Sequence, residues 1–156
     1  MPPLPRSAHP LPRRSGRRPS SCASVNVLVA FCDLDDFKTI NDDLGHHAGD
    51  EVLCVVADAL RRVVRGRDLV ARFGGDEFVI VVSGVEGETE ARLLGERLVV
   101  SVRELDSPVS LSVGICGPGP ASETTLMRRA ADEAMYETKR AGKNSWTHRR
   151  WEPTAG

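Results

Sequence analysis

Acidic residues gather at two separate places in this 156-residue sequence, and each group borders an apolar segment. Asp33 ends the first apolar segment, whereas Asp76 and Glu77 follow the glycine pair Gly74-Gly75. If folding brought the groups together, their charges would repel, and one carboxyl would take up a proton unless a cation lay between them. Mg²⁺ binds one or two protein carboxylates and completes its ligands with water or phosphate oxygens. These acids therefore point to a divalent metal site for a phosphate-bearing ligand.

The glycine pair leaves a second interpretation open. Gly74 and Gly75 tolerate positive φ angles and would let a bulky ligand approach the backbone closely. A solvated hairpin tip, with Asp33 capping the helix that follows it, would explain the same residues without any ligand. Composition alone favours neither interpretation.

The apolar patterns around these acids predict an α+β domain. Alternating or continuous apolar runs predict strands, and apolar residues three or four apart predict helices. The predicted strands are 25–34, 68–73, 78–84, 108–117 and 144–150, and the predicted helices are 36–45, 49–64, 89–105 and 122–142. This order, β-α-α-β-β-α-β-α-β, describes a ferredoxin-like fold in which helices flank a mainly antiparallel central sheet. The hairpin 68–84 would lie beside the first strand, so both acidic groups would meet at one edge of the sheet.

The helix predicted at 122–142 is expected to cover the sheet with one apolar row. Leu126, Ala130 and Ala134 recur at intervals of four, which places them on one face of the helix. Gly142 is the expected end of this helix.

The charge distribution separates residues 1–24 from the rest of the chain. This segment is rich in proline, has no apolar periodicity, and is predicted to be a disordered tail before a single domain at 25–150. It contains five arginines and no acid, so the remainder holds 16 basic against 22 acidic residues. A nucleic-acid-binding surface on the folded domain is therefore not expected.

The cysteines and the apolar runs indicate a cytoplasmic setting. Cys22, Cys32, Cys54 and Cys116 are widely spaced, which predicts buried free thiols in a reduced compartment. No apolar run approaches the roughly 18 residues that a membrane span requires. We therefore expect no membrane segment.

Many separated motifs resemble those of the GGDEF family of diguanylate cyclases. The matching segments are DLDDFKTIND at 33–42, Gly45-His46, Gly49-Asp50, RFGGDEF at 72–78, Ser112-Val113-Gly114, Ala131-Asp132, Tyr136, Lys139 and GKN at 142–144. The resemblance runs in order from about Val25 to Trp146 and favours the metal site over the hairpin tip. It implies a cyclase-palm fold and a nucleotidyltransferase that joins two GTP molecules into the bacterial second messenger cyclic di-GMP. It also implies a homodimer, because two such domains face each other.

The resemblance assigns roles in metal binding and catalysis to four residues. Asp33 and Asp76 would bind Mg²⁺ or Mn²⁺ through their carboxylates, and Leu34 would add its backbone carbonyl. Glu77 would be a further ligand or would help to remove the proton of the attacking hydroxyl. Such metals neutralise phosphate charge and lower the pKa of the attacking hydroxyl.

The resemblance also assigns residues that hold GTP. Asn41 and Asp50 would read guanine, since a carboxylate can accept hydrogen bonds from its N–H groups. The remaining expected substrate contacts are Phe37, Lys38, Gly74, Gly75, Lys139 and Lys143. Lys143 stands where arginine is more usual in the family, which keeps the charge but loses the two-pronged geometry.

Arg65 and Asp68 form an RxxD motif that resembles the inhibitory site of the family, where the product binds back. Arginine can stack on guanine and grip phosphate, which suits cyclic di-GMP. The helix after the hairpin would supply a further arginine, and Arg92 and Arg97 are both candidates.

The chain departs from the family pattern before its first strand. Family members carry a helix there, and residues 1–24 are too polar to supply it in full, so we expect this helix to be missing from a fragment or a chain with a mis-assigned start. The leading hypothesis is a diguanylate cyclase under product feedback. The alternative is an inactive or truncated module that binds GTP or cyclic di-GMP in signalling.

Overall fold

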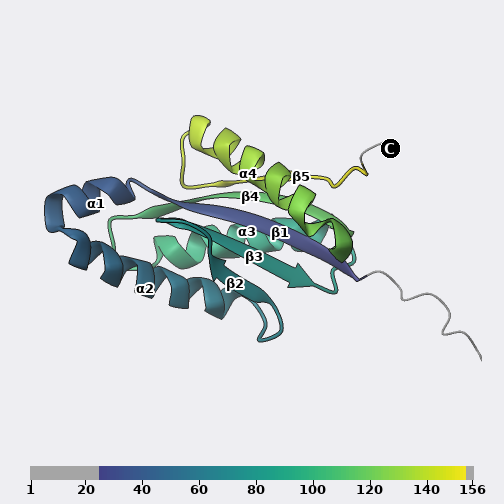
Figure 1. Ribbon diagram of the computed structural model, residues 1–156, viewed down its shortest axis with the longest axis horizontal. Coiled ribbons are helices and arrows are strands. Elements are labelled where there is room, and N and C mark those ends of the chain that lie inside the picture. The colour runs from purple at the N-terminus through teal and green to yellow at the C-terminus, as the bar shows by residue number, and fades with distance from the viewer. Residues whose placement is uncertain (1–24, 154–156) are drawn as a thin grey trace, which may run out of the picture.

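The computed structural model describes residues 25–153 (Figure 1), so the predicted tail at 1–24 lies outside the described residues. The elements are β1 (Asn26–Asp35), α1 (Phe37–Leu44), α2 (His46–Val63), β2 (Leu69–Arg72), β3 (Glu77–Ser83), α3 (Glu88–Arg103), β4 (Ser110–Pro120), α4 (Thr124–Arg140) and β5 (Trp146–Arg149). Their order is the predicted one, with a short 3₁₀ helix (Ala121–Glu123) added before α4.

The strands form one sheet in the order β2-β3-β1-β4-β5. β1 pairs antiparallel with both β3 and β4, and β2 pairs antiparallel with β3. β5 pairs parallel with β4, because α4 carries the chain back across the sheet before β5 begins. The predicted α+β class and mainly antiparallel sheet are therefore confirmed, and the hairpin lies beside β1 as expected.

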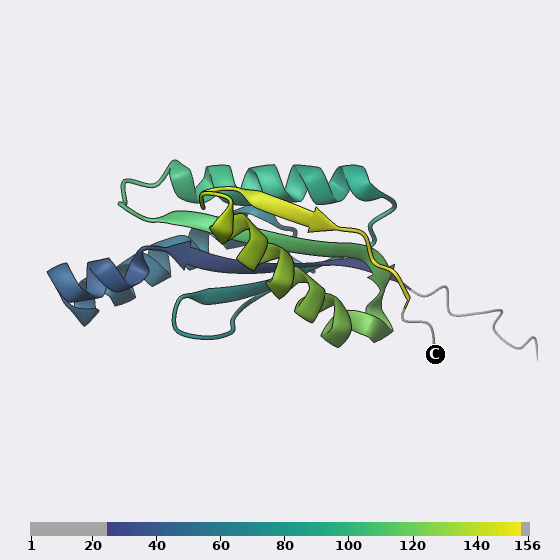
Figure 2. The ribbon, with the colours of Figure 1, turned by 90° about the horizontal axis from the view of Figure 1, so that it is seen from above.

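Side chains of β1 alternate between two hydrophobic layers. Leu28 and Ala30 belong to the core that packs against α1, α2 and α3. Val29 and Phe31 belong to the layer that α4 covers. Figure 2 shows α3 and α4 on opposite sides of the sheet. Asp33 continues the second set, so its side chain lies on the α4 face.

The buried row predicted for α4 is wrong by one position at its start. Leu126 is 36% exposed, whereas Met127, Ala131 and Met135 are buried against the sheet. Ala134 is buried as predicted. Both rows have helical spacing, so the periodicity could not choose between them.

Gly114 in β4 decides how α4 sits on the sheet. A Cβ atom at this position would lie 1.9 Å from the carbonyl oxygen of Ala131 and 2.2 Å from the backbone nitrogen of Met135. The backbone of α4 therefore rests directly on the backbone of β4. This close approach fixes which side chains of α4 point inward.

The cysteine prediction is correct in part. Cys32 and Cys116 are buried free thiols, and burial raises the pKa of Cys116 to about 11. Cys54 is exposed, because it lies one position beyond the inward-facing Leu53 of α2. Cys22 lies outside the described residues. Between residues 25 and 153, no helix is both long and apolar enough to cross a membrane.

We predict that Gly114→Ala lowers the free energy of unfolding by more than about 2 kcal/mol, because the added methyl group would overlap the backbone of α4. Gly66→Ala is the matched control, since a Cβ there meets no atom within 4 Å. Chemical denaturation measures both. Equal stability of the two variants would contradict the direct seating of α4 on β4.

Candidate functional site

The two acidic groups meet where β1 ends and β3 begins. Asp33 is the register partner of Glu77, and residues opposite each other in an antiparallel ladder share a face of the sheet. The backbone N–H of Leu34 donates a hydrogen bond of 3.1 Å to the carbonyl oxygen of Asp76. The predicted convergence of Asp33, Asp76 and Glu77 is therefore confirmed.

Residues 73–76, here called the glycine turn, are held by the preceding arginine. The Arg72 guanidinium donates from Nη2 to the Gly75 carbonyl oxygen at 2.7 Å and from Nε to the Gly74 carbonyl oxygen at 3.1 Å. A Cβ on Gly74 would lie 2.5 Å from the carboxylate of Glu77. Glycine at this position thus leaves room for Glu77 to fold over the turn.

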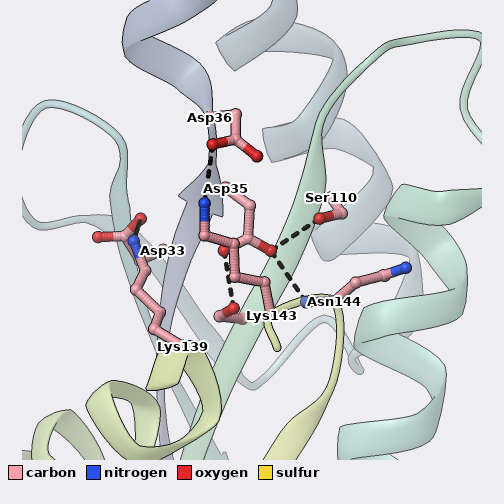
Figure 3. Close-up of polar contacts among 8 residues, drawn as sticks. Asp33, Asp35, Asp36, Ser110, Lys139, Lys143 and Asn144 are labelled. Carbon is pink, nitrogen blue, oxygen red and sulfur yellow. Dashed lines mark hydrogen bonds and ion pairs between the residues drawn. The ribbon is translucent and has the colours of Figure 1, made fainter. Parts of the chain in front are cut away.

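Lys139, near the end of α4, pairs with Asp33 across this site (Figure 3), and its Nζ lies 2.5 Å from Oδ1 of Asp33. Burial raises the pKa of Asp33, and the charges of Asp76 and Glu77 raise it further, whereas Lys139 lowers it. The net effect is a raised pKa. Lys139 thus offsets only part of the cost of gathering three carboxylates.

Asp35 has a structural role that the sequence did not reveal. It is buried and accepts hydrogen bonds of 2.7 Å from the hydroxyls of Ser110 and Ser112. The backbone N–H of Asn144 donates to it at 3.0 Å (Figure 3). Asp35 therefore ties the end of β1 to β4 and to the loop before β5. Its spacing of two from Asp33 was the available signal, since both must share one face of the strand.

Asp36, next to Asp35 in the chain, forms an exposed ion pair with Lys143. Lys143 Nζ lies 2.8 Å from the Asp36 carboxylate, and Asp36, the residue before α1, has a φ angle of 58°. An exposed pair of this kind contributes little stability. Lys38 is exposed on α1. Lys139 and Lys143 thus both lie near the end of β1, each paired with an aspartate.

Asn41 and Asp50 lie on α1 and α2, where the two helices pack closely. A Cβ on Gly49 would lie 2.0 Å from Oδ1 of Asn41 and 3.2 Å from the ring of Phe37. Asp50, the next residue along α2, lines a groove of about 610 Å³ that Arg72 of the hairpin also lines. Asp50 therefore shares a groove with Arg72, the residue that precedes the glycine turn.

The RxxD motif lies in a separate pocket. The Asp68 carboxylate accepts hydrogen bonds from the backbone N–H groups of Arg65, at 2.8 Å, and of Ser83, at 3.2 Å. Arg65, Asp68 and Arg97 line a pocket of about 180 Å³, which Arg92 does not line. Of the two candidate arginines on α3, the pocket lining therefore favours Arg97 as the one that acts with Arg65 and Asp68.

A family model described as "Diguanylate cyclase, GGDEF domain" matches residues 17–145. The chain belongs to the GGDEF family. The sequence of this GGDEF domain is 41% identical over 128 residues to that of the diguanylate cyclase DgcP of Pseudomonas aeruginosa. That match covers 76% of this chain and 19% of DgcP, so the chain spans about a fifth of that relative.

Solved structures of the family share the fold of this GGDEF domain. A mutant of TpbB (YfiN) from Pseudomonas aeruginosa, comprising only the GGDEF domain, is 36% identical with a TM-score of 0.72, and the match covers 79% of this chain and 76% of that one. The GGDEF domain of DgcB from Caulobacter crescentus, in complex with cyclic di-GMP, is 30% identical with a TM-score of 0.70. That match covers 80% of this chain and 78% of the DgcB chain. The predicted cyclase-palm fold is thereby confirmed.

We predict that Asp33→Asn stabilises the metal-free GGDEF domain at neutral pH. A carboxyl whose pKa is raised by folding holds its proton more tightly in the folded chain, so its ionisation as the pH rises costs stability. The substitution should raise Tm at neutral pH by on the order of 2 °C. This gain should shrink as the pH falls through the folded-state pKa, because wild-type Asp33 is then protonated as well.

Thermal denaturation in the presence of a chelator measures this effect. Asp36→Asn is the control, since Asp36 is exposed and should change Tm little at any pH. A lower Tm for Asp33→Asn at neutral pH would show that the ion pair with Lys139 outweighs the cost of burial.

Proposed function

We propose that this GGDEF domain is a diguanylate cyclase that condenses two GTP molecules into cyclic di-GMP and releases two pyrophosphates. The observation that carries the proposal is the meeting of Asp33, Asp76 and Glu77 at one end of the sheet, beside Lys139. Gathered carboxylates of this kind lower stability and are retained where function needs them. The similarity to the diguanylate cyclase DgcP supports the same activity.

The site residues fit Mg²⁺ or Mn²⁺ as the cofactor. Within residues 25–153, no three His, Cys, Asp or Glu side chains are grouped closely enough to hold an ion by themselves. Mg²⁺ needs only one or two carboxylates when water and phosphate oxygens complete its ligands, and Asp33 and Asp76 can supply these, with the Leu34 carbonyl. When bound, the ion would neutralise phosphate charge and lower the pKa of the attacking hydroxyl.

The chain's own residues would bind and orient GTP. Asp50, which lines the groove shared with Arg72, would accept hydrogen bonds from the N–H groups of guanine, and the amide of Asn41 would make a further contact with the base. Lys139 and Lys143 would exchange their aspartate partners for phosphate oxygens, with Lys38 as a further cation. Gly74 and Gly75 would let the phosphates approach the backbone.

The reaction then needs two domains. In each half-reaction the 3′-hydroxyl oxygen of one nucleotide forms a bond to the α-phosphorus of the other, the bond to pyrophosphate breaks, and the hydroxyl proton leaves to a base. Glu77, folded over the glycine turn, is the residue that we assign to this proton. One domain holds one GTP, so a homodimer brings the two hydroxyls to the two phosphates.

Product feedback would act through the pocket that Arg65, Asp68 and Arg97 line. Its lining residues are not those of the acidic site, so a molecule bound there would leave the acids free. The DgcB structure in complex with cyclic di-GMP supports this compound as the ligand. The same pocket is the observation that favours the alternative function, a GGDEF module that binds cyclic di-GMP without turnover.

We predict that the chain, incubated with GTP and Mg²⁺, forms cyclic di-GMP at a rate per chain that rises with protein concentration. Asp76→Asn should lower this rate by at least about 100-fold, because it removes a carboxylate from the reacting centre. Glu86→Gln, an exposed acid beyond the other end of β3, should leave the rate unchanged. Product analysis by chromatography measures each rate. Absence of product from a folded chain at every concentration would leave only the binding module.

We predict that cyclic di-GMP binds through Arg65 and Arg97. Arg65→Ala and Arg97→Ala should each weaken binding by roughly tenfold or more, because each removes a charged phosphate or guanine contact. Arg92→Ala is the matched control on the same helix, and should change Kd by less than about twofold because Arg92 does not line the pocket. Calorimetric titration with cyclic di-GMP measures the Kd of each variant. Equal losses for Arg92→Ala and Arg97→Ala would contradict the assignment.

A further inference from the structure

The first residue of the glycine turn is held between two side chains from other elements. The ring of Phe73 packs edge-on against Phe31 of β1, with ring centroids 5.4 Å apart and an interplanar angle of 70°. On α4, the guanidinium carbon of Arg128 lies 4.7 Å from the centroid of the Phe73 ring. A cation at this distance from a ring is attracted by the electrons of its face.

We propose that Arg128 is a positioning residue, which holds the glycine turn in its working shape through this contact with Phe73. The inference rests on the proposed cyclase function, since the shape matters because it places Asp76 and Glu77. Nothing requires Arg128 itself to touch the nucleotide.

The backbone of the glycine turn needs contacts from other elements to restrain its conformation. Gly74 and Gly75 lack side chains, so this stretch has more conformational freedom than any other residue pair would give it. Arg72 fixes the two glycine carbonyls from inside the turn. Phe73 is 55% exposed, so burial of its ring against Phe31 alone is incomplete. Arg128 supplies the second contact that keeps this ring in place.

Within the described residues, the guanidinium of Arg128 contacts the ring of Phe73 and no acidic side chain. No carboxylate within residues 25–153 forms an ion pair with its guanidinium. Arg128 is half-buried, whereas the next residue, Arg129, is exposed. The attraction between the half-buried guanidinium of Arg128 and the ring of Phe73 restrains the positions of both side chains.

Two residues of α4 contact the acidic site, one on the side of β1 and one at the glycine turn. Lys139, near the end of the same helix, pairs with Asp33 of β1. Arg128, one residue after the buried Met127, contacts the turn that carries Asp76. The ladder between β1 and β3 brings the acids together, and α4 contacts both sides of the site, through Lys139 and Arg128. This helix rests on β4 at Gly114.

The test uses the full chain and the variants Arg128→Met, Arg128→Lys and Arg129→Met. Arg128→Met should lower kcat for cyclic di-GMP formation by roughly tenfold and leave KM for GTP within about twofold, because it disturbs the placing of the acids and not the grip on the nucleotide. Arg128→Lys should recover much of the loss, since a lysine keeps the cation. The exposed neighbour, in Arg129→Met, should change neither constant.

A second readout does not depend on activity. The backbone N–H groups of Phe73 and Gly74 both donate to the carbonyl oxygen of Glu77, at 2.8 and 3.4 Å. In the metal-free chain, Arg128→Met should speed hydrogen exchange at these two amides by roughly tenfold, whereas amides in the centre of β3 should exchange as in the wild type. Amide NMR spectra record both sets.

A double-mutant cycle locates the effect in the ring. Phe73→Leu should lower kcat as Arg128→Met does, and the two substitutions together should cost no more than either alone. Additive losses, or an Arg128→Met variant with wild-type kcat and exchange, would overturn the proposal. If Arg128→Met fails to fold, Phe73→Leu gives the exchange readout at the amide of Gly74. If the wild type makes no cyclic di-GMP, the proposed function fails, and exchange at Phe73 and Gly74 still decides whether Arg128 holds the turn.

Discussion

Asp33 and Glu77 stand opposite each other in the ladder between β1 and β3, and like charges at such positions repel. Asp76 adds a third charge nearby. Burial raises the pKa of Asp33, and the charges of Asp76 and Glu77 raise it further. Two cationic side chains near the acids stabilise this arrangement. Lys139 reaches Asp33 from α4, and Arg72 binds the carbonyls of the glycine turn from within. In the proposed function these acids would bind a metal ion, and in the ligand-free chain Lys139 offsets part of their negative charge.

Asp33 and Asp35, two acids on the same strand, have different roles. Asp35 is fully engaged by hydroxyl and backbone donors, so it serves as an anchor between β1, β4 and the loop before β5. Asp33, two residues earlier on the same face, has a lysine as its partner, and a lysine can move to a phosphate. In the proposed function, binding of GTP would therefore change the partner of Asp33 and leave the hydrogen bonds of Asp35 in place.

The chain holds one half of a proposed two-domain reaction and spans about a fifth of the relative DgcP. The structure describes residues 25–153 of this chain. Within them, α4 links the parts of the half-site, because it carries Lys139 and Arg128 and rests on Gly114. A change in the position of α4 would therefore disturb both of these side-chain contacts.

The sequence by itself determined the order of the elements and the meeting of the acids. The continuous apolar run of β1 and the glycine pair between two short strands are local patterns, and a hairpin beside β1 brings Asp33 to Glu77. Only the tertiary structure decided the buried row of α4, the choice of Arg97 over Arg92, and the contact of Arg128 with Phe73. Each of these depends on how a helix is rotated and seated on the sheet. Helical spacing allows several such rotations, and contacts between residues far apart in the chain select one of them.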